Sequence, residues 1–217
     1  YDAENLYLAV RTPGEKLTAD GTDSTICWDD AIELYVSPGR TRSKVAHWIV
    51  NSRGRVYSEL NQKSGWKAPG FQSVSKVSGG VWTLEAKIPF ASLGVKAPAD
   101  GEVWELNFCR TVTFPKVVYT SFGPSSGSYL AGLVPVRFDS GAPAYAVRLN
   151  GNLNTGHIEF GAASPKCVLS GKLRPDGSPE QPVAAGGKFR DFGDTGTLDL
   201  AVKSGSNTLY QAEWAFR

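Results

Sequence analysis

The sequence has no methionine, two histidines and three cysteines, and each shortage argues against a class of chemistry. Without methionine or a CxxCH motif, haem binding is not indicated. His47 and His157 lie in different halves of the chain and outside any nucleophile motif, which argues against triad catalysis. Cys27, Cys109 and Cys167 are widely spaced without a CxxC pair, unlike zinc ligands. They fit small buried side chains, and one disulfide with a free thiol stays open as the alternative.

Long apolar runs and an excess of one charge are also missing. No stretch approaches the length of a membrane span, and no signal peptide is recognisable. The net charge is +2 with both signs interspersed, so nothing indicates nucleic acid as a partner. What is abundant is punctuation: 24 glycines and 13 prolines separate many short β-branched or aromatic runs. Together with a length of 217 residues, this pattern predicts an all-β protein with one large or two small domains.

One short strand organises the first half of the chain. Read with a period of two residues, Ile32, Leu34 and Val36 face a core, whereas Glu33 and Tyr35 face the other side. A carboxylate beside an aromatic ring suits a polar, flat-faced ligand such as a sugar. The alternative is an ordinary sandwich strand with its polar face in water, because exposed Glu and Tyr need no further explanation.

Similar alternation predicts the other strands of a first unit and of a second, smaller one. The first covers residues 1–138 and the second residues 144–217, with a Gly/Pro-containing linker between them. The further strands are expected at 6–10, 45–51, 55–57, 73–77, 81–88, 103–110 and 134–138, then at 145–149, 156–160, 167–173, 197–202 and 209–216. The size of the second unit is that of an immunoglobulin-like β-sandwich, and we expect it to be an accessory module.

The tryptophans divide by their position in these runs. Trp48, Trp82 and Trp104 alternate with core residues and are predicted to be buried. Trp28 and Trp66 lie in or beside loops, where an aromatic ring can contact a ligand. Both are therefore candidates for ligand contact.

Five ordered segments of the first unit carry a family resemblance. They are Tyr1-Asp2 with Asn5-Leu6-Tyr7, Trp28-Asp29-Asp30-Ala31-Ile32-Glu33-Leu34-Tyr35, Trp48-Ile49-Val50-Asn51, the run from Trp82 to Gly94, and Trp104-Glu105-Leu106-Asn107-Phe108-Cys109-Arg110. Over about residues 1–138 the chain resembles the family 9 carbohydrate-binding modules and their relatives among the DOMON-like β-sandwiches. This resemblance implies non-catalytic binding of a saccharide or glycan by an accessory module of a larger, carbohydrate-active protein that is secreted or lies on the cell surface.

In sugar-binding members of that family, two aromatic side chains clamp a sugar while acidic and amide side chains hydrogen bond its hydroxyls. By resemblance, Glu33 and Asn51 match the strand glutamate and asparagine, Arg110 ends an Asn-Phe-x-Arg strand, and Tyr129 lies in the closing loop. Parity adds His47 to the side that Glu33 occupies. The predicted carbohydrate site comprises Trp28, Glu33, Tyr35, His47, Asn51, Arg110, Phe122 and Tyr129.

The strands that usually precede the Tyr-Asp motif in that family are absent. We therefore expect an N-terminally truncated sandwich, cut from a longer or processed chain. Its open sheet edge should pair in a dimer or accept a donated strand, because unpaired edges attract partner strands.

Three alternatives to this assignment remain at the level of sequence. Asp20, Asp23, Asp29 and Asp30 cluster at one strand entry and are candidate calcium ligands, although turn-forming aspartates in water explain them too. No other cofactor is indicated. Glu33 paired with Asp29 or Glu85 could form a glycosidase dyad, the enzyme alternative. The third alternative is a structural or interaction module that keeps the fold without a sugar site.

Overall fold

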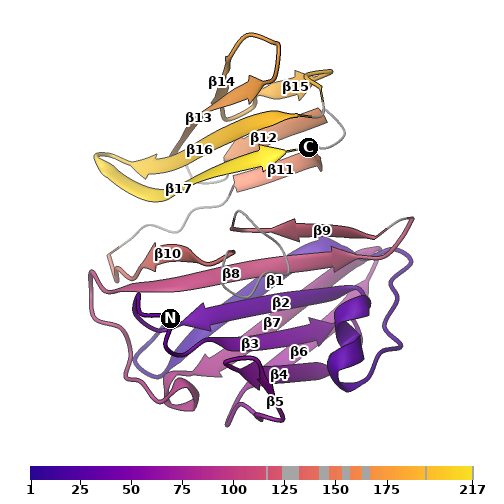
Figure 1. The fold of residues 1–217 in the computed structure, drawn as a ribbon, viewed down its shortest axis with the longest axis vertical. Coiled ribbons are helices and arrows are strands. Elements are labelled where there is room, and N and C mark those ends of the chain that lie inside the picture. Colours follow the sequence, from indigo (N-terminus) through magenta and orange to yellow (C-terminus); the bar gives the residue numbers. More distant parts are fainter. Residues whose placement is uncertain are drawn as a thin grey trace. The chain divides into compact units, whose positions relative to one another are not determined.

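The chain folds as an all-β protein, as its sequence predicts. The computed structural model describes residues 1–115, 117–123, 132–141, 147–152, 157–162, 167–193 and 195–216. In the described residues nearly all regular structure is antiparallel strand, with two short 3-10 helices (Figure 1). The chain divides into two compact units, Tyr1–Asp139 and Ser140–Arg217. Among the described residues, no helix is long and apolar enough to cross a membrane.

Unit 1 contains a small sheet in the order β1-β7-β6, made of β1 (Asn5–Pro13), β7 (Val81–Pro89) and β6 (Gln72–Ser78). Gly79 and Gly80 connect β6 to β7 with positive φ at both positions, the geometry that a two-residue hairpin loop requires. Among the described residues, β1 has β7 as its one strand neighbour and thus forms a sheet edge. A partner strand for this edge stays a prediction.

The large sheet of unit 1 has the order β10-β8-β2-β3-β4-β5, and β9 also pairs with β8. Its strands are β2 (Ala31–Ser37), β3 (Ala46–Asn51), β4 (Val56–Leu60), β5 (Lys63–Ser64), β8 (Val103–Val112), β9 (Val118–Ser121) and β10 (Val134–Arg137). The two sheets pack as layers (Figure 1) around a core that includes Trp48, Trp82 and Trp104. The burial predicted for these three tryptophans is confirmed.

Part of the outer face of the large sheet, over β2 and β3, is covered, which the sequence did not indicate. The 3-10 helix η1 (Asp23–Trp28) places Ile26 against Ala31 and Ile49, and Leu133 packs near Tyr35. All residues of β2 are consequently buried on both faces. The second 3-10 helix, η2 (Phe90–Leu93), adds Phe90 and Leu93 to the inner core.

Unit 2 is built from two further antiparallel sheets. One has the order β11-β12-β15, and the other β14-β13-β16-β17. The strands are β11 (Val147–Asn152), β12 (His157–Ala162), β13 (Val168–Pro175), β14 (Gln181–Ala184), β15 (Lys188–Arg190), β16 (Gly196–Ser204) and β17 (Asn207–Phe216). Phe160, Leu173 and Leu198 lie at the centre of its core. The immunoglobulin-like assignment stays a prediction.

None of the three cysteines, which all lie among the described residues, forms a disulfide. Cys109 is buried, as the sequence suggests for a small apolar side chain, while Cys27 and Cys167 are partly exposed. The disulfide that the sequence left open is not formed.

Candidate functional site

The strand register brings most of the predicted polar residues to one face of the large sheet. Strands β2 and β3 are neighbours, with Tyr35 opposite His47 and Ala31 opposite Asn51. Glu33 therefore shares the outer face with these side chains, as their parity predicts. On this face Glu33, His47 and Asn51 are only 7, 5 and 0 % exposed. The predicted residues therefore lie together, but they are buried and not accessible to a ligand from solvent.

A chain of hydrogen bonds links five of the outer-face side chains, which we name the His47 network. His47 Nε2 lies 2.9 Å from Glu33 Oε2, and His47 Nδ1 lies 3.0 Å from Glu59 Oε1. The Tyr35 hydroxyl donates to Glu33 at 3.0 Å, and the Tyr57 hydroxyl donates to Glu59 at 3.1 Å. The Tyr35 ring also stacks on the imidazole, with centroids 3.9 Å apart and planes 8° from parallel.

Both ring nitrogens of His47 can donate only when the ring is an imidazolium, since neutral imidazole has one N–H. Burial lowers the pKa of His47, but the hydrogen bonds to Glu33 and Glu59 outweigh it and raise the pKa above the ordinary 6.5. The hydrogen bond from His47 in turn lowers the pKa of Glu59. The network thus holds one cation between two carboxylates.

Asn51 has a different set of partners. Its Nδ2 donates to Asp29 Oδ2 at 2.8 Å, and its Oδ1 accepts the backbone N–H groups of Arg53 and Arg55. These bonds fix the turn between β3 and β4. Asp29 also accepts the backbone N–H groups that precede η1, so Asn51 and Asp29 tie η1 to the sheet.

The four aspartates proposed as calcium ligands diverge. Asp20 pairs with Arg53, Asp29 accepts backbone N–H groups, and Asp30 receives Nη2 of Arg110 at 3.0 Å. In the part of the chain that the structure describes, no group of three acidic, histidine or cysteine side chains is placed to hold a metal ion. Three of the four carboxylates thus have other partners, and Asp23 lines a groove described below, so the described residues do not bring the predicted calcium ligands together.

The other predicted sugar contacts also separate. Arg110 lies opposite Ile32 in the register, hence on the face away from Glu33, with its guanidinium 4.9 Å from the centroid of Trp82. Phe122 packs edge-on against Phe108 at 5.6 Å. Trp28 ends η1 and is 70 % exposed. The predicted contact at Tyr129 lies outside the described residues.

An open concavity of unit 1 lies beside the His47 network, along the edge of β4. Strand β5 pairs with β4 only at Glu59 and Leu60, so the preceding residues of β4 have β3 as their one described strand neighbour. A groove of about 590 Å³ forms there, which we name the Tyr57 groove. Its lining consists of Asp23, Ser24, Val56, Tyr57, Ser58, Ser64, Gly65, Trp66, Lys67, Ala68 and Phe71.

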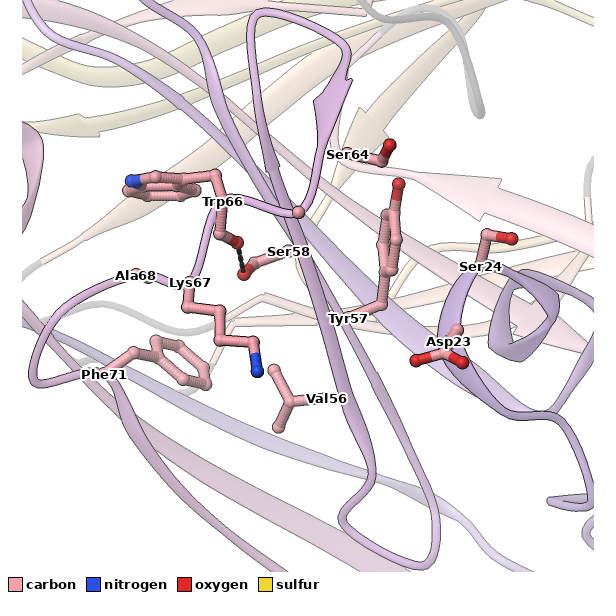
Figure 2. A pocket seen from close by; sticks show the side chains of 11 residues that line it. Asp23, Ser24, Val56, Tyr57, Ser58, Ser64, Trp66, Lys67, Ala68 and Phe71 are labelled. Atoms are coloured by element: carbon pink, nitrogen blue, oxygen red, sulfur yellow. Dashed lines mark hydrogen bonds between the residues drawn. The ribbon is translucent and has the colours of Figure 1, made fainter.

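The walls of the Tyr57 groove are anchored from behind. Figure 2 shows Trp66, Lys67 and Phe71 on one side and Tyr57 with Asp23 on the other. The Ser58 hydroxyl donates to the Trp66 carbonyl at 2.6 Å. Trp48 contacts the rings of Trp66 and Phe71, with centroids 5.5 and 5.6 Å away. Buried contacts therefore hold these aromatic side chains in place.

Tyr57 belongs to both features, since it donates to Glu59 and lines the groove. Trp66 is one of the residues that the sequence indicates for ligand contact, and Tyr57 is not among them. The available signal was a tyrosine on a short strand followed by a polar, tryptophan-containing loop.

No protein-family model matches the chain, and no curated protein matches it either. Among solved structures, one match is a protein from Bacteroides uniformis ATCC 8492 that is provisionally described as carbohydrate-binding. The two chains share 18 % sequence identity, and the match covers 63 % of this chain and 74 % of that chain with a TM-score of 0.47. A similarity of this size carries no argument about the ligand.

Proposed function

We propose that unit 1 is a non-catalytic saccharide-binding module and that the Tyr57 groove holds the sugar. The observation that carries this proposal is the composition of the groove, where aromatic rings stand beside hydroxyl and charged side chains. Its volume of about 590 Å³ falls within the range of roughly 300–1,000 Å³ that is usual for small-molecule sites.

The chemistry of the lining suits a pyranose. Tyr57 and Trp66 both line the groove, and aromatic rings of this kind can stack on the apolar C–H face of a sugar. Asp23 can accept hydrogen bonds from sugar hydroxyls, and Lys67 can donate to their oxygens, in charge-assisted bonds that are stronger than neutral ones. Rings and polar groups around one groove thus support binding by stacking and hydrogen bonding together.

The groove supports binding rather than hydrolysis. Glycoside hydrolysis usually needs two carboxyl groups that flank the scissile bond. Among the described lining residues Asp23 supplies the one carboxylate. Both dyads that the sequence left open, Glu33 with Asp29 or with Glu85, require Glu33, which is hydrogen-bonded to His47. Asp29 is in turn hydrogen-bonded to Asn51. As context we propose an accessory module of a larger secreted or cell-surface protein that acts on polysaccharides.

Trp66 is the lining residue whose replacement tests this proposal most directly. Replacing Trp66 by alanine removes a stacking surface worth about 0.5–1.5 kcal/mol beyond its buried area, so the affinity should fall roughly tenfold or more. We would screen neutral monosaccharides and linear oligosaccharides of glucose, xylose and mannose by glycan array, then titrate the best ligand calorimetrically. Tyr7→Ala is the matched control, because Tyr7 is an exposed aromatic residue on β1.

The same titration separates the alternatives. If Trp66→Ala binds normally while Glu33→Ala does not, the ligand lies on the outer sheet face that the sequence indicated. If the wild type binds none of these sugars, the structural or interaction module is favoured. Circular dichroism of each variant checks that the fold is kept.

A further inference from the structure

We propose that His47 is a positioning residue for the Tyr57 groove: its imidazolium holds Glu59, and Glu59 holds Tyr57, so that ligand binding weakens when His47 loses its proton. This inference rests on the proposed saccharide-binding function. It adds that the affinity is controlled by a buried group that does not touch the ligand.

The His47 imidazole contacts a carboxylate through each of its two ring nitrogens. Carboxylate oxygens of Glu33 and Glu59 lie 2.9 and 3.0 Å from the two ring nitrogens. When His47 is neutral, one nitrogen presents a lone pair to one of these oxygens, and the contact changes from attraction to repulsion. The buried charge of the three groups also changes from −1 to −2, which is costly because burial weakens screening. One contact must then open.

Glu59 is the partner that can move. Glu33 lies on the central strand β2, where it also accepts the Tyr35 hydroxyl, and its side chain is 9 % exposed. Glu59 lies on β4 near the sheet margin, with 16 % of its side chain exposed. The imidazole has two contacts on the β2 side, the bond to Glu33 and the stacked Tyr35 ring, and these favour its staying in place. Deprotonation should therefore release Glu59 toward solvent.

Tyr57 is the side chain that connects Glu59 to the groove. The Tyr57 hydroxyl donates to Glu59 Oε2 at 3.1 Å, and the Tyr57 side chain lines the groove. Without this bond the ring loses its described hydrogen-bond anchor. A mobile ring binds a ligand less tightly than a fixed ring, because the ring must be ordered on binding and this costs conformational entropy.

The other titratable groups around His47 do not imitate this response. Tyr35 on β2 and Tyr57 on β4 both have a pKa raised above 10.0, mainly by burial. The pKa of Cys27 on η1 is raised above 9.0 by burial and by Glu33. Cys109 on β8 is buried on the same sheet face. Glu33 and Glu59 are the two carboxylates that contact the imidazole. Among the side chains of this group other than the carboxylates, histidine has the lowest ordinary pKa, about 6.5 against about 8.5 for cysteine and about 10 for tyrosine.

The direction in which affinity changes with pH follows from the raised pKa of His47. Binding should be fully supported below pH 6.5, where His47 is charged, and should weaken as the pH rises through the higher pKa of the folded protein. The chain has two histidines, so NMR of the imidazole signals can follow both, and a His157→Gln variant assigns them. We expect the affinity for the best oligosaccharide of the panel to fall about tenfold with the same midpoint as the His47 signal.

Variants make the test specific. His47→Gln should bind weakly, with no pH dependence across the former midpoint. Glu59→Gln should lower the pKa of His47 and weaken binding, because it removes one carboxylate from the imidazolium. Glu105→Gln is the matched control: Glu105 is a buried carboxylate paired with Arg42 at 2.7 Å, outside the network. It should keep both the affinity and its pH dependence.

The outcomes separate this inference from the function on which it rests. An oligosaccharide that binds in the Tyr57 groove with constant affinity while His47 titrates overturns the inference and leaves the function standing. Absence of binding at every pH overturns both. A midpoint that matches His47, and that disappears in His47→Gln, supports the inference.

Discussion

Replacing Asp30 by alanine is expected to destabilise unit 1 by roughly 3–5 kcal/mol, the usual result of removing one partner of a buried ion pair. Asp30 is 1 % exposed and accepts Arg110 Nη2 at 3.0 Å and the Thr18 backbone N–H at 2.8 Å. Without the Asp30 carboxylate, the largely buried guanidinium of Arg110 loses the carboxylate with which it is paired. Burial already lowers the pKa of Arg110, and the hydrogen bond to Asp30 opposes this effect.

Urea unfolding of the isolated variants measures the change, and a double variant supplies the control. Asp30→Ala with Arg110→Met removes both charges and should recover most of the loss, because buried pairs often cost as much to desolvate as they gain. Among the described residues, Nε and Nη1 of Arg110 have no hydrogen-bond partner, so methionine removes unsatisfied donors too. A loss below 1 kcal/mol in the single variant would show that water reaches Arg110.

The strands of unit 1 could be predicted because their alternation has a local cause. Leu34 and Trp48 face the core on neighbouring strands, and the same period places Glu33 and His47 on the other side. The period identifies two faces but not what covers each of them. Here η1 covers part of the outer face, so residues expected at a surface are buried.

Helix η1 itself was missed for a physical reason. Its residues have no helical hydrophobic period, and it is held by contacts distant in sequence. Asp29 accepts the backbone N–H groups of Asp20 and Gly21 and also binds Asn51. In the sequence these aspartates resemble metal ligands. An aspartate that accepts backbone N–H groups and an aspartate that binds calcium are the same residue type, so the sequence alone does not distinguish the two roles.

The candidate site shows the same limit. Trp66 could be selected because a tryptophan in a polar loop is unusual. The role of Tyr57 depends on pairing β4 with β3, which sets Glu59 opposite His47, and on β5 ending before it reaches Tyr57. Both depend on the register and length of paired strands, which single-sequence periodicity does not contain.

The second large effect is expected at Trp48, which supports the fold and the groove together. Its side chain is buried in the main core and contacts the rings of Trp66 and Phe71. Replacing Trp48 by alanine should cost about 3–5 kcal/mol of unfolding free energy, the range for losing a buried aromatic side chain. Because Trp66 then loses its backing, affinity for the oligosaccharide should also fall, even where calorimetry is done well below the melting temperature.

Trp48→Phe separates packing from polarity. Among the described residues, nothing accepts the Trp48 indole N–H, which is buried. An unsatisfied buried donor costs about 1–3 kcal/mol. Phenylalanine removes this donor, which should offset part of the stability lost with the smaller ring, so the unfolding free energy should fall by less than about 2 kcal/mol. It also keeps a ring against Trp66 and Phe71, and the affinity should stay close to that of the wild type. If Trp48→Phe is as damaging as Trp48→Ala, the indole N–H has an acceptor. If Trp48→Ala keeps full affinity, the ligand does not depend on the Trp66 wall of the groove.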